Sequence, residues 1–127
     1  MYFVEDGVET HNLIEDNLGM VNHATFALFA SDAHVSTYWI THPNNIVRRN
    51  RAGGSEFYGF WYELVMDLTA PSYTKGTCPY GETLGVFDNN IAHSNERFGL
   101  RIFDWFPRED PCKSGSKAIP TTMKNFQ

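Results

Sequence analysis

Apolar and aromatic residues gather in short runs that polar turns separate. These runs are rich in aromatic and β-branched residues, which favour strands. They occupy residues 1–6, 37–42, 59–65, 84–89 and 98–105. Within the last run Leu100 and Ile102 alternate with Arg101, which turns one face of a strand inward and the other toward solvent. The pattern predicts an all-β chain.

Helical periodicity is weak by comparison. No long segment places apolar residues at i, i+3, i+4 and i+7, and residues 22–35 come nearest to that spacing. We expect a short helix or an irregular loop there.

Three segments repeat one arrangement of asparagine and apolar residues. They read HNLIEDN at 11–17, NNIVRRN at 44–50 and NNIAHSN at 89–95, and each holds two asparagines five positions apart. Such self-similarity indicates a repeat architecture. Aligned on their asparagines, the segments form a column of Asn17, Asn50 and Asn95. Two apolar columns accompany it: Ile14, Val47 and Ala92, and Leu13, Ile46 and Ile91.

The strands around these segments complete the repeating unit. A strand precedes each of the two later segments, and a strand with glycine at its start follows, at Gly59 and Gly99. This order describes one coil of a parallel β-helix, whose coils stack about 4.8 Å apart. Asparagine takes left-handed backbone angles at modest cost, and its amide both donates and accepts. We therefore predict about three coils joined by an internal asparagine ladder.

The repeat spacing also predicts loops. Equivalent asparagines lie 33 and then 45 residues apart, which is more than a bare coil needs. We expect the excess to leave the stack as two excursions, at residues 18–36 and 67–82. Repeat proteins need neighbouring and capping units, so residues 1–127 are expected to be a single, partial domain of a longer solenoid.

The same register explains the one basic run of the chain. If the first two coils are adjacent, Glu15 lies opposite Arg48 and Asp16 lies opposite Arg49. Opposite charges on neighbouring strands attract. We prefer this structural interpretation of Arg48 and Arg49 to a polyanion-binding site.

Composition narrows the functional classes. The net charge of −5 argues against a nucleic-acid surface, which needs clustered Lys and Arg. No apolar run approaches the roughly 20 residues of a membrane span, and MYFVEDGVE lacks the regions of a signal peptide. Cys78 and Cys112 lie in loop-like sequence outside any CxxC motif, so a zinc site is not expected. They form either a disulfide or two free thiols.

An acidic cluster near the start carries the candidate chemistry. It consists of Glu5, Asp6, Glu9 and His11. Paired carboxylates serve as general acid and base in glycoside cleavage, or hold Ca²⁺ through their oxygens. The alternative is a solvated turn, since Asp6-Gly7 is a strong turn dipeptide. The spacing lacks the form of a dedicated calcium loop and no histidine lies in HxH or HExxH, so we expect no metal or other cofactor.

Aromatic residues supply a second candidate surface. Most of them belong in the core, because half of each strand points inward. One or two outward rings would suffice to stack on a sugar. The residues expected to bind carbohydrate are Trp61, Tyr62, Arg48 and His93.

Longer stretches resemble a known family. They are YFVEDGVETHNLIEDNLG, WITHPNNIVRRNRAGGSEFYGFWYEL, APSY and LGVFDNNIAHSNERFGLRIF. These are similar to the large extracellular β-helix proteins related to fibrocystin-L and, more distantly, to the transmembrane and secreted cell-surface hyaluronidases with an eight-glycine domain. The resemblance implies a right-handed parallel β-helix in the ectodomain of a large protein of the cell surface or cilia. That extracellular context favours a disulfide between Cys78 and Cys112.

Two functions follow from these observations. The first is a non-enzymatic structural or binding segment that presents its loops to matrix, carbohydrate or other surface proteins, beside the rest of a parent ectodomain. The alternative is an enzyme domain that depolymerises a polysaccharide, namely hyaluronan. Neither function involves nucleic acid or contact of this segment with a membrane.

Overall fold

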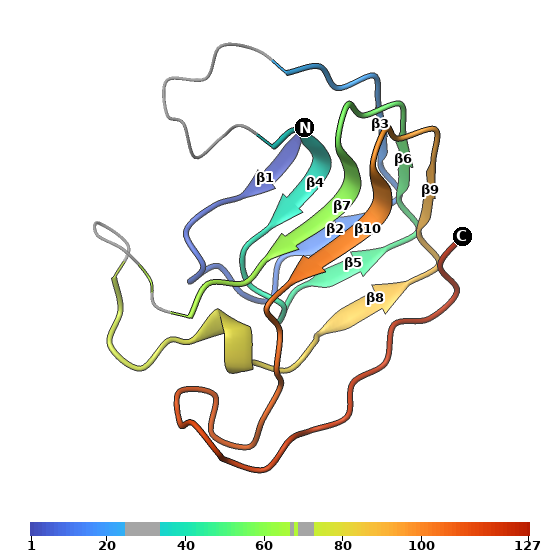
Figure 1. The fold of residues 1–127 in the computed structure, drawn as a ribbon. Coiled ribbons are helices and arrows are strands. Elements are labelled where there is room, and N and C mark those ends of the chain that lie inside the picture. The colour runs from blue at the N-terminus through green and yellow to red at the C-terminus, as the bar shows by residue number, and fades with distance from the viewer. Residues whose placement is uncertain (25–33, 67, 69–72) are drawn as a thin grey trace.

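A computed structural model describes residues 1–24, 34–66, 68 and 73–127 and shows three parallel sheets (Figure 1). The sheet orders are β1-β4-β7-β10, β2-β5-β8 and β3-β6-β9, and every strand pair is parallel. The strands are β1 (Tyr2–Val4), β2 (Leu13–Glu15), β3 (Leu18–Met20), β4 (Ser36–Ile40), β5 (Ile46–Arg48), β6 (Arg51–Gly53), β7 (Tyr58–Glu63), β8 (Val86–Asp88), β9 (Ile91–His93) and β10 (Phe98–Phe103). Each coil takes one strand from each sheet, so the predicted parallel β-helix of about three coils is confirmed.

Stacked aromatic rings fill the interior on the side of the four-stranded sheet. The rings of Tyr2 and Tyr38 lie 4.8 Å apart and those of Tyr38 and Phe60 lie 4.6 Å apart, each pair within 8° of parallel. Such pairs add about 0.5–1.5 kcal/mol beyond the area they bury. The adjoining sheet β3-β6-β9 offers small residues, in the register Gly19, Ala52 and Ala92. A Cβ on Gly19 would clash with the side chain of Thr37, which is why this position is glycine.

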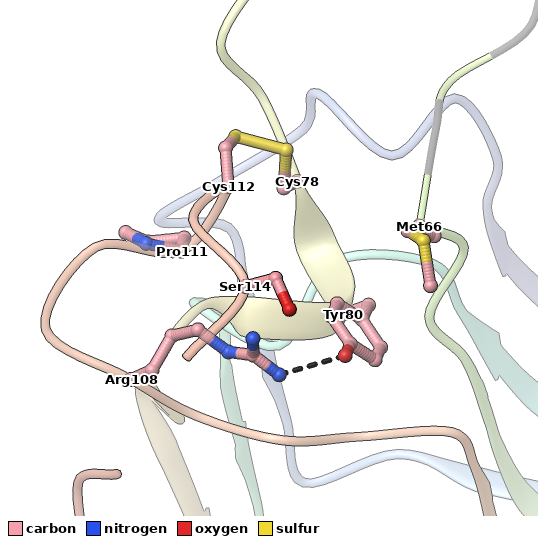
Figure 2. A pocket seen from close by; sticks show the side chains of 7 residues that line it. All are labelled: Met66, Cys78, Tyr80, Arg108, Pro111, Cys112 and Ser114. Carbon is pink, nitrogen blue, oxygen red and sulfur yellow. Dashed lines mark hydrogen bonds between the residues drawn. A yellow bond between two sulfur atoms is a disulfide. The ribbon is translucent and has the colours of Figure 1, made fainter. Parts of the chain in front are cut away.

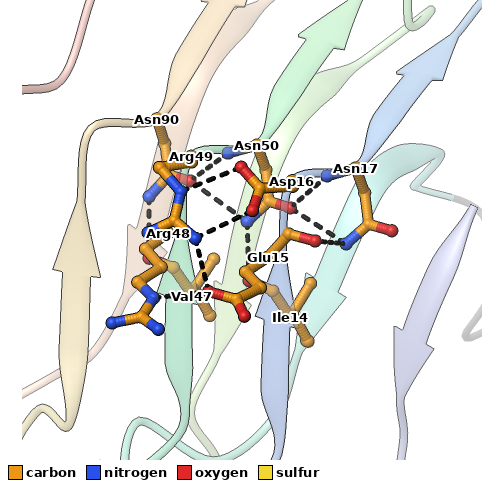
Figure 3. A network of polar contacts seen from close by, with 9 residues as sticks. All are labelled: Ile14, Glu15, Asp16, Asn17, Val47, Arg48, Arg49, Asn50 and Asn90. Carbon is orange, nitrogen blue, oxygen red and sulfur yellow. Dashed lines mark hydrogen bonds and ion pairs between the residues drawn. The ribbon is translucent and has the colours of Figure 1, made fainter.

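A ladder of buried amides joins the coils along one corner (Figure 3). The Oδ1 atom of Asn50 accepts from the backbone N and the Nδ2 atom of Asn17, both at 3.1 Å. The Oδ1 atom of Asn90 accepts from the same two groups of Asn50, at 3.0 and 3.2 Å. Each Nδ2 also reaches a carbonyl of the coil before it, Asn50 to Ile14 at 2.8 Å and Asn90 to Val47 at 2.9 Å. Asn50 and Asn90 are fully buried, and these bonds satisfy their amides.

A shorter ladder follows a second corner. The Oδ1 atom of Asn45 accepts from the backbone N and Nδ2 of Asn12, at 2.9 and 3.2 Å, and its own Nδ2 donates to the carbonyls of Glu9 and His42. Gly85 follows at this corner in the third coil, where a Cβ would lie only 2.5 Å from the carbonyl oxygen of Asn45. Close approach of the two backbones thus ends this ladder after two coils.

The predicted place of Asn95 in the first ladder is wrong. Its Oδ1 accepts from the backbone N of Ser55 at 3.0 Å, at the next corner along the chain. Val47 and Arg48 consequently pair with Phe87 and Asp88. Corners follow one another every five residues within a coil, so the asparagine spacing fits two registers and the sequence alignment slipped by one corner.

The slip changes the predicted columns of the third coil. Ala92 pairs with Ala52 and His93 with Gly53, while Ile91 pairs with Arg51. None of the three lies over the residue that the alignment gave it. The first two coils have the predicted register, with Leu13, Ile14 and Glu15 paired to Ile46, Val47 and Arg48.

The left-handed backbone angles fall one residue earlier than expected. Asp16, Arg49 and Asn89 have φ values of 57°, 56° and 53°, and each directly precedes a ladder asparagine. The turn residue bends the chain from one sheet into the next, and the asparagine after it points its amide inward. The turn position therefore accepts several residue types, whereas in these three coils the residue after it is asparagine.

The excursions lie partly as expected. Residues 18–20 form β3, so the first excursion begins after Met20 and not at residue 18. The helix or loop expected at 22–35 lies largely outside the described residues. The second excursion runs between β7 and β8, and a third, which the sequence analysis missed, runs from residue 104 to the parallel bridge between Lys124 and Asp88.

The end of the chain continues the fourth coil, which β10 begins, beneath the third. The backbone N of Gln127 donates to the carbonyl of Asn90 at 3.2 Å, as Ile91 does to Asn50 one coil above. Phe126 therefore takes the place of the next ladder asparagine. Its ring lies 5.6 Å from that of Phe87 and 6.1 Å from that of Phe60, so an apolar side chain packs against the core at this position.

The turn after β4 buries a histidine. His42 is only 3% exposed, and its Nδ1 accepts from the backbone N of Asn44 at 3.1 Å. Burial, with a smaller effect of His11, lowers the pKa of His42 from 6.5 to about 4. The ring is thus neutral in the folded chain at neutral pH.

Replacing Asn50 with alanine should destabilise the chain far more than replacing Asn95. Asn50→Ala removes bonds to both neighbouring coils and leaves buried groups without partners, at a cost of about 2–4 kcal/mol in the free energy of unfolding. Asn95→Ala removes one bond and a buried Nδ2 that has no partner among the described residues, and should cost about 1 kcal/mol or less. Urea unfolding of both variants measures the difference, and equal costs would contradict the ladder at Asn50.

Acidification should weaken the fold through His42. Because its folded pKa lies below its unfolded one, only the unfolded chain binds this proton between pH 6.5 and about 4. The stabilisation is complete above pH 6.5 and is lost as the pH falls toward 4, by on the order of 3 kcal/mol. His42→Asn keeps an acceptor for Asn44 and should flatten the pH dependence of the unfolding free energy, whereas the exposed control His93→Asn should not. Parallel curves for wild type and His42→Asn would refute this assignment.

Candidate functional site

The acidic cluster is a hydrogen-bonded turn after β1. A carboxylate oxygen of Glu9 accepts from the backbone N of Glu5 at 2.9 Å, and the backbone N of Gly7 donates to Thr41 Oγ1 at 2.9 Å. Gly7 has a φ of 70°, which the turn requires. Glu5, Asp6, Glu9 and His11 are all exposed. A catalytic role for them stays a prediction.

Metal binding finds no preformed site in the described part of the chain. There, no three His, Cys, Asp or Glu residues lie close enough together to hold an ion. His11 instead uses its Nδ1 with Thr10 Oγ1, at 3.0 Å. The expectation of no cofactor, with Ca²⁺ as the candidate ion, stays a prediction.

The charged residues of the first two coils pair as their register predicted (Figure 3). Arg48 Nε lies 2.6 Å from Glu15 Oε2, and Arg49 contacts Glu15 at 2.7 Å and Asp16 at 2.8 Å. The hydrogen bond from Arg48 lowers the pKa of Glu15, and that from Arg49 lowers the pKa of Asp16. The basic run is thus matched by carboxylates on the neighbouring strand.

The four residues expected to bind carbohydrate lie on different faces. Arg48 is on the outer face of β5. His93 is on β9, and its exposed ring lies over Gly53 of β6. Trp61 is only 6% exposed and packs against Trp39, with 4.3 Å between the ring centroids. These side chains do not converge on one site.

Tyr62 corrects the predicted sugar-binding set. It is 1% exposed and belongs to the core, with its ring 6.1 Å from that of Phe87. Burial raises the pKa of its hydroxyl. An inward ring does not reach a surface ligand.

Two excursions combine into one surface beside the solenoid. We call the described residues among 64–85 and 104–122 the loop layer. Both segments leave the four-stranded sheet, after β7 and β10, and both return to the neighbouring sheet, so they lie on the same side (Figure 1). The loop layer is therefore a continuous feature built from two consecutive coils.

Hydrogen bonds and one covalent bond hold the two segments together. Phe106 N donates to the carbonyl of Tyr80 at 2.9 Å, and Arg108 N donates to that of Gly81 at 3.0 Å. Gly81 follows a short 3-10 turn (Pro79–Gly81), and a Cβ on it would clash with the backbone of Pro111. The indole N of Trp105 donates to the carbonyl of Glu82 at 2.9 Å. The layer is packed and hydrogen-bonded.

The disulfide between Cys78 and Cys112 is confirmed. Their Cα atoms are 5.3 Å apart, and the bond closes a loop across 34 positions of sequence. In the chain-entropy model such a loop contributes about 3–4 kcal/mol. A cavity of about 190 Å³ opens beside the two sulfur atoms (Figure 2).

Helices contribute little to this structure. Among the described residues, no helix is long and apolar enough to cross a membrane.

Comparisons with known proteins identify relatives of the chain and its family. It is 34% identical to fibrocystin-L of Mus musculus and 36% identical to that of Homo sapiens, over 98% of this chain and 3% of each relative. It is 32% identical to the cell surface hyaluronidase CEMIP2 of Homo sapiens, over 80% of this chain and 9% of that protein. The chain thus spans only a small part of these relatives. The model of the CEMIP beta-helix family matches residues 1–100, and the chain belongs to that family.

Proposed function

We propose that this chain is a non-catalytic segment of an extracellular β-helix protein of the fibrocystin-L type, which presents the loop layer to partners. The observation that carries the proposal is the disulfide-clamped loop layer, fixed on a rigid stack of coils. Ligand-binding groups are commonly carried by loops that such a scaffold positions. The partners would be matrix polysaccharide or other surface proteins, beside the rest of a parent ectodomain of which residues 1–127 are a partial domain.

Two further observations support an extracellular place. Disulfides persist mainly in oxidising compartments, and Cys78 and Cys112 are bonded. Relatives include proteins named as cell-surface hyaluronidases. We extend this to the cell surface and, through the fibrocystin-L likeness, to cilia.

The names of other relatives favour a second candidate function. They include the cell migration-inducing and hyaluronan-binding protein of Homo sapiens, 33% identical over 80% of this chain. On this alternative the chain belongs to a domain that cleaves hyaluronan, with Glu5 and Asp6 as acid and base and Ca²⁺ as a candidate cofactor. Against it, the carboxylate of Glu9 closes the turn that carries them.

A polymer-length assay separates the two functions. Size-defined hyaluronan, incubated with the protein in its full-length parent with and without Ca²⁺, should keep its length distribution on an electrophoretic gel. Glu5→Gln and Asp6→Asn should change nothing, because no catalysis depends on them. Shortening of the polymer that either substitution abolishes would overturn the non-catalytic proposal.

A further inference from the structure

Arg108 has a charge that the loop layer does not neutralise. Its Nη2 donates to the hydroxyl of Tyr80 at 2.7 Å, its Nε to the carbonyl of Phe106 at 3.0 Å, and its Nη1 to the carbonyl of Lys113 at 3.4 Å. The guanidinium carbon also lies 4.8 Å from the centre of the Tyr80 ring. All these partners are uncharged. Within the described part of the chain, Arg48 and Arg49 form ion pairs, whereas Arg108 has no carboxylate within ion-pair distance.

This cation lines a cavity whose other polar groups are hydroxyls (Figure 2). The cavity beside the disulfide holds about 190 Å³. Its lining consists of Met66, Cys78, Tyr80, Arg108, Pro111, Cys112 and Ser114. The guanidinium of Arg108 and the hydroxyls of Tyr80 and Ser114 are the polar side-chain groups, while the thioether, the proline ring and the disulfide form apolar walls.

Hydrogen-bond donors remain available in this cavity. A guanidinium carries five N–H groups, and three of those of Arg108 are accounted for above. The hydroxyl oxygen of Tyr80 accepts from Arg108, so its own proton is available to donate. Ser114 adds a third hydrogen-bonding side chain, and its exposed hydroxyl can turn toward a ligand. Convergent donors around one positive charge suit a planar oxyanion, which arginine binds in bidentate fashion.

We propose that this cavity binds the side-chain carboxylate of a glutamate or aspartate on a partner protein. The apolar walls favour this source over a sugar acid, because they match the methylene groups of an acidic side chain. Sugar recognition usually needs an open aromatic platform, and the Tyr80 ring already packs on the guanidinium. The inference rests on the proposed function, since it assigns a partner class to the loop layer.

The disulfide assembles this carboxylate site. Cys78 and Tyr80 belong to the segment after β7, whereas Arg108, Cys112 and Ser114 belong to the segment after β10. The covalent bond between the segments keeps the donors of both around one space. Binding should therefore depend on the oxidised state of the two cysteines.

An NMR titration tests the site with a minimal probe. N-acetylglutamic acid α-amide offers only a side-chain carboxylate, and N-acetylglutamine amide is its uncharged match. The acid should shift the signals of the Met66 methyl group and the Arg108 Nε–H in a saturable way in the millimolar range, and the glutamine amide should not. Absence of saturable shifts, or equal binding of both probes, would refute the proposal. Tighter binding of glucuronate than of the acid probe would also refute it, in favour of a sugar ligand.

Variants locate the binding within the cavity. Tyr80→Phe keeps the ring under Arg108 but removes the hydroxyl, and should weaken binding about tenfold. Ser114→Ala should weaken it by a smaller factor, whereas Tyr73→Phe, on the same segment and 62% exposed, should leave it unchanged. Reduction of the disulfide should abolish the shifts. Unchanged affinity in Tyr80→Phe and Ser114→Ala would place any binding elsewhere, and unchanged affinity after reduction would contradict the role of the disulfide.

The NMR titration and the hyaluronan assay test different claims, so that one can fail without the other. Cleavage of hyaluronan would overturn the proposed non-catalytic function whatever the titration shows. A failed titration with intact hyaluronan would remove the carboxylate site and leave the non-catalytic segment standing.

Discussion

The constraint on which the structure depends is that an amide buried at a corner of the coil must find partners in the coils above and below. Asn50 satisfies this condition in full, with bonds to Asn17, Asn90 and the carbonyl of Ile14. A buried polar group left without a partner costs more than a typical hydrogen bond contributes. A slip of the coils by one residue would turn such amides away from their partners. The ladder therefore fixes the vertical register, and the aromatic stack and the surface ion pairs follow from it.

With the register fixed, each sheet contributes a different kind of side chain. The four-stranded sheet supplies the stacked rings of Tyr38 and Phe60, and the adjoining sheet β3-β6-β9 supplies small residues that make room for them. On the outside of the sheet β2-β5-β8, Glu15 and Arg48 form an ion pair. The loop layer adds a surface beside this stack of coils.

The sequence predicted the strands and the first two coils because their signals are local and independent. The asparagine spacing, the apolar columns and the opposite charges of Glu15 and Arg48 all indicated one register. In the third coil the asparagine spacing stood alone. Asn95 lies at the next corner, and a five-residue interval between corners makes the two alignments equivalent in sequence. The charge of Asp88 opposite Arg48 was the signal that distinguishes them.

Other features could not be read from a local pattern. Tyr62 and Trp61 are neighbours of the same type, and their opposite directions depend on the pairing of β7 with β4. The length of the excursion after β10 depends on where the chain returns to the stack, and the bridge between Lys124 and Asp88 marks that point. Arg108 was not among the candidate residues, since its cavity joins segments that are distant in sequence.

The replacement of the next amide by Phe126 has a mechanical consequence. Between the third and fourth coils, an apolar ring stands where the coils above share hydrogen-bonded amides, so this junction resists separation less well through its side chains. The Cys78–Cys112 bond spans the same junction, because one cysteine follows β7 and the other follows β10. Under tension along the axis of the stack, the disulfide would therefore resist separation of the third and fourth coils, where the asparagine ladder does not continue.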